Sequence, residues 1–474
     1  MDTSSPKLPL YVDLDGTLIK SDLMFESILL LVKQNLMFVI ALPFWLVKGR
    51  AYFKAQLAER VQVSVDQLPV NKEFHAHLQN EKKQGRELIL ISASNQDAVE
   101  DVSSHFNLFS DAIGSGPILN LKAHKKLEKI KELTEGEQFS YAGNSIDDLP
   151  IWQEASEALL VNCSDRLANR VNNAQINQFD RPPSLFAKLL QAMRPHQWLK
   201  NLLVFVTLVL SHQLDQTSLL LLSLVAYISF CLCASSVYFL NDLFDLNSDR
   251  KHQTKCKRAF ASGDLPLAAG FIGGPILFLA ALAIALSLPQ TFILVLLVYW
   301  LLTSLYTYFL KTLFLVDVFT LAILYTLRIV AGAAAISVEI TVWLLAFSFF
   351  LFLGLALVKR VTELLNVIAE GKDKIEGRAY RDSHISFLSR IGSASSAAAI
   401  VVFILYITAP ETTELYNRPL VLWLICPLLM FLLYRIWQFA HTQKLEEDPV
   451  LFALTDRVGQ AIALACGMLI WIAA

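Results

Sequence analysis

The stretch Asn241-Asp-Leu-Phe-Asp-Leu-Asn-Ser-Asp249 places three carboxylates where a long apolar segment ends. Asp242, Asp245 and Asp249 are spaced i, i+3 and i+7, so on a helix they line one face. Carboxylates beside hydrocarbon are unfavourable unless a cation neutralises them. Oxygen ligands of this kind suit Mg²⁺, which keeps several waters and bridges to substrate phosphates. The stretch therefore predicts a site for magnesium and a diphosphate at a membrane surface.

The composition divides this chain of 474 residues into two parts. Overall, 55% of the residues are hydrophobic and only 17% are charged, which is less charge than soluble proteins carry. Residues 1 to about 190 have an ordinary soluble composition, whereas apolar blocks dominate beyond Trp198. The net charge of −2 gives no indication of a nucleic-acid partner, and we expect none.

Nine segments in the apolar part have lengths near those that a bilayer core demands. They lie at about 199–212, 217–240, 268–286, 290–309, 312–334, 340–358, 392–409, 420–440 and 457–473. Lys and Arg gather in every second loop between them, which predicts a multi-pass protein of the cell inner membrane. The same alternation predicts a cytoplasmic N-terminal domain and a C-terminus outside. Asp242, Asp245, Asp249, Lys311 and Asp317 then all lie near the cytosolic face.

Four segments of the soluble part follow one another in a recognisable order. Residues 8–14 form a short apolar strand that runs into Asp13-Leu-Asp15-Gly-Thr17. Leu88-Ile-Leu-Ile-Ser92 is a second buried strand, and Lys126 and Tyr141-Ala-Gly-Asn-Ser-Ile-Asp-Asp148 come later. In this order they resemble the four motifs of the haloacid dehalogenase superfamily of phosphotransferases. Strands that alternate with helical stretches predict an α/β domain with a parallel sheet over residues 1–185.

This resemblance implies a role for each motif residue. Asp13 would be the nucleophile that forms an aspartyl-phosphate, and Asp15 would be the general acid and base. Ser92 and Lys126 would hold phosphate oxygens. Mg²⁺ would be bound by Asp13, Asp15 and Asp148.

The fourth motif departs from the superfamily in one residue. Its usual Gly-Asp is Gly143-Asn144 here, and an amide lacks the negative charge that draws in Mg²⁺. A degenerate phosphatase fold that serves as a scaffold is therefore the alternative to an active phosphatase.

The segment from Leu23 to Val47 is strongly apolar and long enough to cross a bilayer. A crossing there would put Asp13 and Ser92 on opposite sides of the membrane. The haloacid dehalogenase superfamily often carries a helical cap at this point, so we expect a cap over about 22–80. Its apolar face would lie on the membrane or on the transmembrane domain, and the basic flank Lys48-Gly-Arg50 fits lipid head groups. A buried pair of cap helices is the alternative.

Three motifs of the apolar part carry a second resemblance. Arg194-Pro-His-Gln-Trp-Leu-Lys-Asn201, the 241–249 stretch and Lys255-Cys-Lys-Arg-Ala-Phe-Ala-Ser-Gly263 follow one another as in the UbiA-type intramembrane prenyltransferase superfamily. Tyr306-Thr-Tyr-Phe-Leu-Lys311, before Asp317 and Arg328, is similar to the branch of polyprenyl-phosphate phosphoribosyltransferases. Lys359-Arg360 and Gly377-Arg378-Ala-Tyr380 continue the match. The resemblance implies an all-α membrane bundle over residues 186–474.

The resemblance also implies a reaction. We expect Mg²⁺-dependent transfer of a phosphoribosyl group from 5-phosphoribosyl-1-diphosphate to a polyprenyl phosphate, and the N-terminal domain would then remove the 5-phosphate. Asp242, Asp245 and Asp249 would be catalytic and would hold the metal together with Asp317. The residues expected to contact substrate are Lys200, Asn241, Lys257, Arg258, Tyr306, Lys311 and Arg328.

Several alternatives stay open at this point. Many members of the superfamily have a second Asp-x-x-x-Asp pair, but Asp317 is followed four residues later by Leu321, which argues against a second metal cluster. Prenyl transfer from a prenyl diphosphate to an aromatic or other acceptor is one alternative function. A membrane scaffold or transporter with a vestigial phosphatase domain is another. Arg328 either acts on substrate or pairs with Asp317 inside the bundle.

Overall fold

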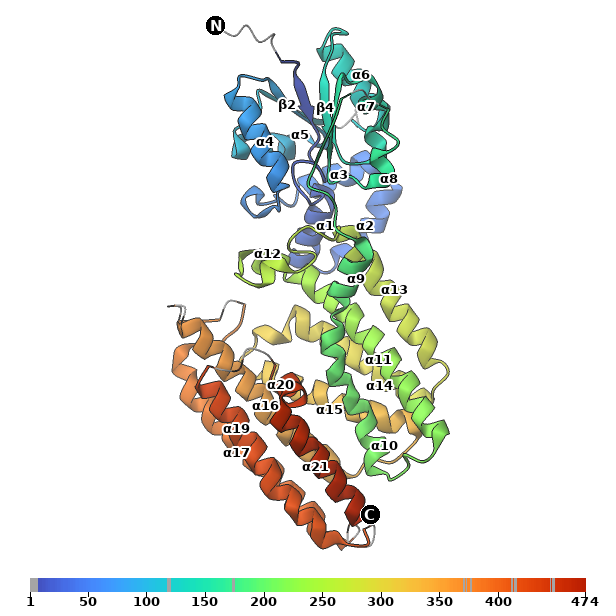
Figure 1. Cartoon of the computed structure of the whole chain (residues 1–474), viewed down its shortest axis with the longest axis vertical. Coiled ribbons are helices and arrows are strands. Elements are labelled where there is room, and N and C mark those ends of the chain that lie inside the picture. Colours follow the sequence, from blue (N-terminus) through green and yellow to red (C-terminus); the bar gives the residue numbers. More distant parts are fainter. Residues whose placement is uncertain are drawn as a thin grey trace. The chain divides into compact units, whose positions relative to one another are not determined.

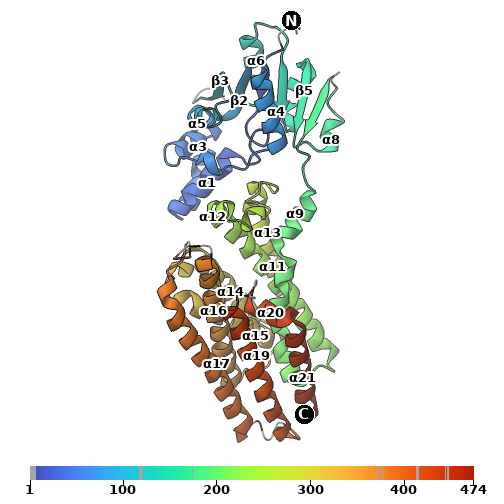
Figure 2. The same cartoon turned by 60° about the vertical axis from the view of Figure 1, so that its left-hand side comes forward.

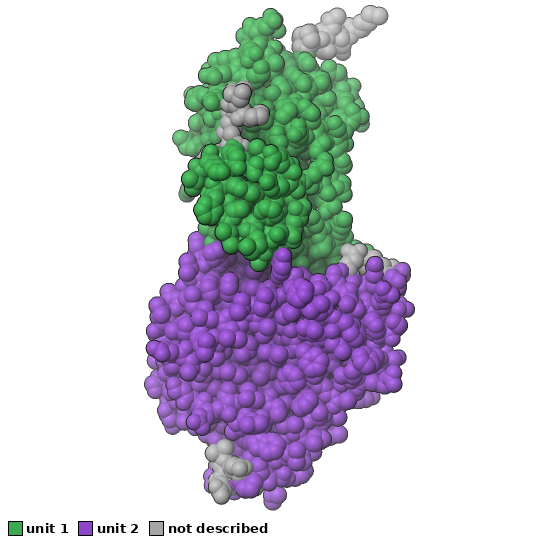
Figure 3. All heavy atoms as spheres, turned by 180° about the vertical axis from the view of Figure 1, so that it is seen from behind, with its two compact units in different colours: residues 1–192, 242–272 green, residues 193–241, 273–474 purple. Residues whose placement is uncertain are grey.

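The computed structural model describes residues 7–116, 121–172, 175–369, 371, 373–375, 377–410, 412, 416–443, 445 and 448–474. The chain forms two compact units, which Figure 3 distinguishes by colour. Unit 1 consists of Met1–Ala192 and Asp242–Ile272, and unit 2 consists of Met193–Asn241 and Gly273–Ala474. The segment with the three aspartates is thus grouped with the N-terminal residues. The domain boundary expected after residue 185 stays a prediction.

Unit 1 is built on a six-stranded parallel sheet with the strand order β3-β2-β1-β4-β5-β6. The strands are β1 (Leu10–Val12), β2 (Leu88–Asn95), β3 (Asp111–Ser115), β4 (Ser140–Gly143), β5 (Glu157–Val161) and β6 (Ile176–Phe179). Because β1 lies between β2 and β4, the residues that follow these three strands meet at one edge of the sheet. The predicted parallel α/β fold is confirmed.

Helices cover both faces of this sheet, as Figure 1 shows. Leu10 and Val12 pack with α4 and α5, whereas Tyr11 packs with α6 and α7. This alternation is the period of two expected of a strand that is buried on both faces. The helices of the sheet domain are α4 (Lys72–Lys83), α5 (Gln96–Phe106), α6 (His124–Leu133), α7 (Leu149–Glu154) and α8 (Asp165–Ala168), with the 3₁₀ turns η1 (Val65–Gln67) and η2 (Ile146–Asp148).

Three helices form the cap between β1 and α4: α1 (Leu23–Gln34), α2 (Phe38–Val47) and α3 (Arg50–Ala58). The Asp22 side chain caps α1 by accepting a 2.8 Å hydrogen bond from the Met24 N–H. Because α1 has 12 residues and α2 has 10, neither reaches the roughly 20 residues that a bilayer crossing needs. In α2 no side chain is buried, and Phe44 and Val47 are 67% and 88% exposed.

The remaining elements of unit 1 are α9 (Leu185–Met193), α12 (Leu246–Lys251) and η4 (Lys255–Lys257). Most of unit 2 is helical: η3 (Pro195–Phe205), α10 (Val206–Leu210), α11 (Thr217–Phe244), α13 (Leu267–Ala285), α14 (Gln290–Tyr308), η5 (Leu310–Thr312), α15 (Val316–Ile336), α16 (Val342–Ala369), η6 (Asp382–His384), α17 (Ile385–Thr408), η7 (Pro419–Leu424), α19 (Ile425–His441), α20 (Pro449–Thr455) and α21 (Arg457–Ala473). In Figure 2, α16, α17 and α19 run side by side, and their apolar side chains share one core with α15. The predicted all-α bundle is confirmed.

The number of membrane spans differs from the prediction. Among the described residues, seven helices are long and apolar enough to cross a bilayer, and eight are if the bent pair α20 and α21 forms one span. The predicted count of nine is therefore not confirmed. The segment expected as the first span, 199–212, folds instead as η3 followed by the five-residue α10.

The residues of η3 explain why this segment is not a long helix. Lys200 and Asn201 are buried polar side chains, with 7% and 1% exposure, and both find partners inside unit 2. A Cβ atom at Gly332 of α15 would lie 2.0 Å from the Val204 carbonyl oxygen, so this close approach of the two backbones requires glycine. Hydropathy alone does not separate such a buried, irregular segment from a span.

Candidate functional site

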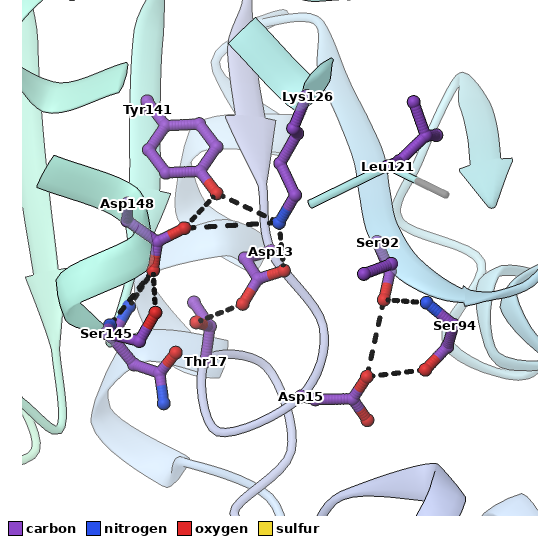
Figure 4. A network of polar contacts seen from close by, with 12 residues as sticks. Asp13, Asp15, Thr17, Ser92, Ser94, Leu121, Lys126, Tyr141, Ser145 and Asp148 are labelled. Carbon is purple, nitrogen blue, oxygen red and sulfur yellow. Dashed lines mark hydrogen bonds and ion pairs between the residues drawn. The ribbon is translucent and has the colours of Figure 1, made fainter. Parts of the chain in front are cut away.

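The predicted phosphatase residues converge at the carboxyl edge of the sheet (Figure 4). Asp13 directly follows β1, Ser92 lies in β2, and Asp148 ends η2 after β4. The Lys126 ammonium of α6 lies 2.6 Å from Asp13 Oδ1 and 4.0 Å from Asp148 Oδ1. Thr17 Oγ1 donates to Asp13 Oδ2 at 3.1 Å. The two carboxylates therefore share one ammonium group.

Asp148 is held in place by several donors. The Tyr141 hydroxyl donates to Asp148 Oδ1 at 2.7 Å, and the backbone N–H groups of Asn144 and Ser145 donate to Oδ2 at 3.1 and 2.9 Å. Asn144, which replaces the usual acidic residue, lies against the loop after β1. A Cβ atom at Gly16, whose φ is +81°, would lie 1.9 Å from Asn144 Nδ2.

The Asp15 carboxylate points away from Asp13 in this structure. It accepts hydrogen bonds from Ser94 Oγ at 2.6 Å and Ser92 Oγ at 3.3 Å (Figure 4), and from the Leu23 N–H at 2.9 Å. Ser92 was expected to hold a phosphate oxygen, and here it contacts Asp15. The motif comparison did not single out Ser94, although it lies two residues beyond Ser92 in the same strand.

Burial sets the protonation of this site. It raises the pKa of Asp13 to about 6, against the Lys126 charge, which lowers this pKa. It also raises the pKa of Asp15 to about 6, with the negative charge of Asp22 adding to the shift. Burial alone would lower the pKa of Lys126, but Asp13 and Asp148 raise it. Lys126 is thus a cation, and the two aspartates titrate in the range useful for acid–base chemistry.

The three aspartates of the 241–249 stretch do not lie on one continuous helix. The helix α11 ends at Phe244, and Asp245 is the N-cap residue of α12, which carries Asp249. Arg258 joins the two others, because its Nη1 atom lies 2.5 Å from Asp249 Oδ2 and 3.4 Å from Asp242 Oδ1. Burial raises the pKa of Asp249, and Arg258 opposes this shift.

Unit 1 contains two acidic sites, one around Asp13 and Asp148 and one around Asp242 and Asp249. Among the described residues, no three His, Cys, Asp or Glu side chains are gathered as ligands of one ion. At each site, however, two buried carboxylates share a positively charged side chain, Lys126 in one and Arg258 in the other. Carboxylate oxygens that call for a cation are the ligands that Mg²⁺ prefers, so the residues present fit this ion.

Two further predicted residues belong to the 241–249 stretch or follow it in the sequence. Asn241 is half-buried in α11, and Lys257 is exposed in η4. Arg250, to which the sequence motifs gave no role, forms an ion pair with Glu26 of α1.

In unit 2, Asp317 is enclosed by basic and phenolic groups. Arg360 Nη2 lies 2.7 Å and Arg378 Nη1 3.4 Å from Asp317 Oδ2, and the Tyr380 hydroxyl donates to Oδ1. Arg378 also donates to the hydroxyl of Tyr306 at 3.2 Å, which places this predicted residue beside the Asp317 cluster. Asp317 and Arg360 are fully buried. Lys311, another predicted residue, is half-buried in η5.

Arg328 does not pair with Asp317, so that alternative was wrong. Arg328 Nε donates to Asn201 Oδ1 at 2.9 Å, and its Nη2 donates to the Tyr299 hydroxyl at 3.1 Å. The two residues lie on one face of α15, but eleven residues correspond to a rise of about 16 Å, which is too far for an ion pair. The Arg328 guanidinium instead lies over the ring of Tyr325, 5.0 Å from its centroid.

Asp448 is a buried residue of unit 2 that sequence reasoning missed. Its Oδ2 atom lies 3.0 Å from Lys200 Nζ and 2.8 Å from Lys359 Nζ, and the Tyr325 hydroxyl donates to its Oδ1 at 2.9 Å. Burial raises the pKa of Asp448, but Lys359 and Lys200 outweigh this and hold the pKa well below its usual range. Two lysines on one carboxylate leave a net positive charge, which suits an anionic substrate group.

The apolar part of the chain matches a known protein family. Residues 201–456 match the UbiA prenyltransferase family. The chain belongs to this family. The uncharacterized protein y4nM of Sinorhizobium fredii is 36% identical over 98% of this chain and 92% of its own length. The nodulation protein NoeC of Azorhizobium caulinodans is 30% identical over 60% of this chain and 91% of its own.

A third relative of this UbiA-family chain has a named activity. The decaprenyl-phosphate phosphoribosyltransferase of Mycolicibacterium smegmatis is 31% identical over 47% of this chain and 70% of its own length. Among solved structures, a UbiA homolog from Archaeoglobus fulgidus bound to GPP and Mg²⁺ matches 60% of this chain and 98% of that chain, with a TM-score of 0.44 and 16% identity. A phosphoserine phosphatase in apo form matches 37% of this chain and 95% of its own, with a TM-score of 0.28 and 15% identity. The protein is a multi-pass membrane enzyme of the UbiA type with an N-terminal parallel α/β domain.

Proposed function

We propose that this enzyme transfers a phosphoribosyl group from 5-phosphoribosyl-1-diphosphate to a polyprenyl phosphate, with release of diphosphate. The N-terminal domain then removes the 5-phosphate from the lipid-linked product. The loop charges support a location in the cell inner membrane, with the three aspartates on the cytosolic side and the C-terminus outside. A soluble phosphorylated donor reaches the aspartates from that side.

The enclosure of Asp317 is the observation that carries this choice of donor. A second metal cluster for a prenyl diphosphate needs a second set of available carboxylates, and Leu321 stands where a partner of Asp317 would be. Asp317 already binds Arg360, Arg378 and Tyr380, and these contacts would be lost if it turned to a metal ion. In our proposal Asp317 therefore positions the two arginines and is not the metal ligand that the sequence led us to expect. The relatives named decaprenyl-phosphate phosphoribosyltransferase support the same donor.

The transfer step follows from charge. Asp242, Asp245 and Asp249 would hold Mg²⁺, which, when bound, neutralises the charge that develops on the departing diphosphate. Arg258 leaves the two carboxylates and contacts the diphosphate. The phosphate oxygen of the lipid attacks the anomeric carbon, and the bond from that carbon to the diphosphate breaks. An ionised phosphate is its own nucleophile and needs no general base.

The phosphatase step uses the residues around Asp13. Its carboxylate attacks phosphorus, the bond from phosphorus to the sugar 5-oxygen breaks, and Asp15 gives its proton to that oxygen. Water then attacks the phosphorus of the aspartyl-phosphate, its proton passes to Asp15, and the bond from phosphorus to the Asp13 oxygen breaks, which frees inorganic phosphate and restores the Asp13 carboxylate. Lys126 holds the phosphoryl oxygens, and Asp148 would complete the set of carboxylates for Mg²⁺. Asp15 must turn from Ser94 to reach the leaving oxygen.

A donor-choice assay tests the proposal. Membranes that contain the enzyme are given labelled 5-phosphoribosyl-1-diphosphate with polyprenyl phosphate, or labelled prenyl diphosphate with an aromatic acid. We expect label in the lipid extract from the first pair and its loss in Asp242→Asn and Asp249→Asn. A labelled prenylated product from the second pair alone would establish prenyl transfer instead. If Asp242→Ala and Asp245→Ala leave every lipid product unchanged, a scaffold or transporter is the better description.

A further inference from the structure

A cavity of about 390 Å³ opens beside the phosphatase residues of unit 1. One wall is formed by Asp15 and Gly16 of the loop after β1 and by Asn144 of the fourth motif. A second wall is formed by Phe260 and by residues 263–268, which follow Arg258 in the chain. We call this space the catalytic-loop cavity. The other lining residues are Lys20, Ser21, Asp22, Phe25, Asn162, Pro182, Pro183 and Leu185.

The wall of residues 260–268 is fixed by ion pairs to Lys20, which follows the loop after β1, and to α9. Asp264 binds Lys20 at 3.0 Å through Oδ1 and Lys188 of α9 at 2.8 Å through Oδ2. Gly263 has a φ of +74°, and a Cβ atom there would lie 2.6 Å from Lys20 Cβ. The backbone N–H of Lys20 in turn donates to the Pro69 carbonyl at 2.7 Å. Ion pairs and close backbone contacts therefore hold the residues that line the cavity in place.

The lining of the catalytic-loop cavity suits a neutral, hydroxyl-rich group. Asp22, Asn144 and Asn162 offer oxygen acceptors and amide donors for hydroxyl groups. Among the described lining residues the one cationic side chain is Lys20, and Asp264 already neutralises it. The cation for a phosphate group is Lys126, which pairs with Asp13 and does not line the cavity. The volume lies within the range of small-molecule sites.

The segment that forms this wall directly follows residues that we assign to the transferase. Arg258, which joins Asp242 and Asp249, lies two residues before Phe260 of the cavity wall. Asp249 is followed by Arg250, which binds Glu26, and Phe25 lines the cavity. The wall thus continues directly from the residues that we assign to the transfer step.

We infer that the catalytic-loop cavity binds the ribose of the lipid-linked phosphoribosyl product, an inference that rests on the proposed function. The 5-phosphate faces Asp13 and Lys126, the ribose hydroxyls bind the amides and carboxylates of the cavity, and the phosphodiester to the lipid faces residues 260–268. The phosphatase site thereby selects a lipid-linked sugar phosphate over a free one.

A cavity-filling variant tests this inference. Ala268 is half-buried in the cavity wall, and Ala268→Trp places an indole in the space for the sugar. We expect kcat/KM for release of the 5-phosphate from purified lipid-linked phosphoribose to fall at least about tenfold. Transfer of labelled phosphoribose and hydrolysis of acetyl phosphate, which has no sugar, should stay within about twofold of wild type. The neighbouring Ala269→Trp, which does not line the cavity, is the matched control and should release the 5-phosphate like wild type.

A second variant tests the inference independently if Ala268→Trp fails to fold. Asn162 has a φ of +53°, so Asn162→Gly keeps the backbone conformation and removes only the amide. We expect a higher KM for lipid-linked phosphoribose with an unchanged kcat. Unchanged kinetics in both Ala268→Trp and Asn162→Gly would overturn the inference, as would equal wild-type kcat/KM on free ribose 5-phosphate. If wild type itself releases no 5-phosphate, or Asp13→Asn releases it as well, the proposed phosphatase function fails instead.

Discussion

Glu26 and Arg250 lie 224 residues apart in the chain and form an ion pair inside unit 1. Arg250 Nη2 is 2.6 Å from Glu26 Oε1, and the two side chains are only 7% and 3% exposed. Glu26 belongs to α1, whose first N–H group binds Asp15, and Arg250 follows Asp249. One buried pair therefore links the cap helix beside the proposed phosphatase acid, Asp15, to the helix that carries a proposed metal ligand of the transferase.

This pair predicts that Glu26→Gln disturbs the transferase although Glu26 lies in the cap. The change leaves the buried Arg250 guanidinium without its charge partner, which lowers the free energy of unfolding by about 3–5 kcal/mol. We expect a lower melting temperature in detergent and a higher Mg²⁺ requirement for transfer. The double variant Glu26→Met with Arg250→Met should recover much of the stability, because apolar replacement of both partners removes the buried charge.

The control is the same substitution in an exposed pair. Glu59 and Arg60 form such a pair, with side chains 62% and 35% exposed. Glu59→Gln should therefore change neither the melting temperature nor the Mg²⁺ requirement for transfer. Wild-type melting and Mg²⁺ dependence in Glu26→Gln would show that the link between α1 and α12 has no effect on the site.

Arg258 provides a second prediction. It joins Asp242 and Asp249, and in the proposed reaction it moves to the departing diphosphate. Arg258→Met should lower kcat/KM for phosphoribosyl transfer about 10²–10³-fold, the usual effect of losing one charge-stabilising donor. Lys251→Met removes an exposed cation of the same segment and should stay near wild type. Equal losses in both variants would mean that only the overall positive charge of the segment matters.

The raised pKa of Asp15 predicts a pH dependence of stability without metal. Its pKa is about 6 in the folded protein and 3.8 as the ordinary value, so the folded form binds more protons between these pH values. The stability that this group contributes is complete below about pH 4 and is lost as the pH rises through 6. The Asn side chain of Asp15→Asn does not titrate there and still accepts a hydrogen bond from Ser94.

The measurement is the difference in melting temperature between Asp15→Asn and wild type, in detergent with EDTA. We expect this difference to rise in favour of the variant as the pH increases from 4 to 7. A difference that is flat over this range would contradict the raised pKa.

The exposed apolar side chains of α2 predict contact with lipid. Phe44 is 67% exposed, and no side chain of this helix is buried. A photo-crosslinking amino acid at position 44 should therefore label lipid when the full-length enzyme is in nanodiscs. Leu133 of α6 is an apolar side chain outside the cap with 41% exposure, and a crosslinker there should not label lipid. Equal lipid labelling from both positions would contradict a specific membrane contact of α2.

The fold and the site around Asp13 could be predicted because both depend on short sequence motifs. A short apolar strand that runs into Asp13 and Asp15 places both residues at a sheet edge, and order along the chain identifies Lys126 and Asp148. Asp448 carried no such signal, because it is a single aspartate before a proline whose lysine partners come from distant helices. The Glu26–Arg250 pair is equally non-local. The segment at 199–212 was misjudged because hydropathy averages over Lys200 and Asn201, which are buried inside unit 2.

In the proposed function, phosphoribosyl transfer and removal of the 5-phosphate follow one another on the same lipid. This order of reactions is tested most directly with donor that carries ¹⁴C in the ribose and ³²P in the 5-phosphate, given with polyprenyl phosphate to the purified enzyme. We predict that ¹⁴C enters the lipid extract while ³²P appears as inorganic phosphate, and that Asp13→Asn retains both labels in the lipid. A lipid extract without ¹⁴C would contradict phosphoribosyl transfer, and one in which wild type keeps ³²P and ¹⁴C in equal amounts would contradict the phosphatase step.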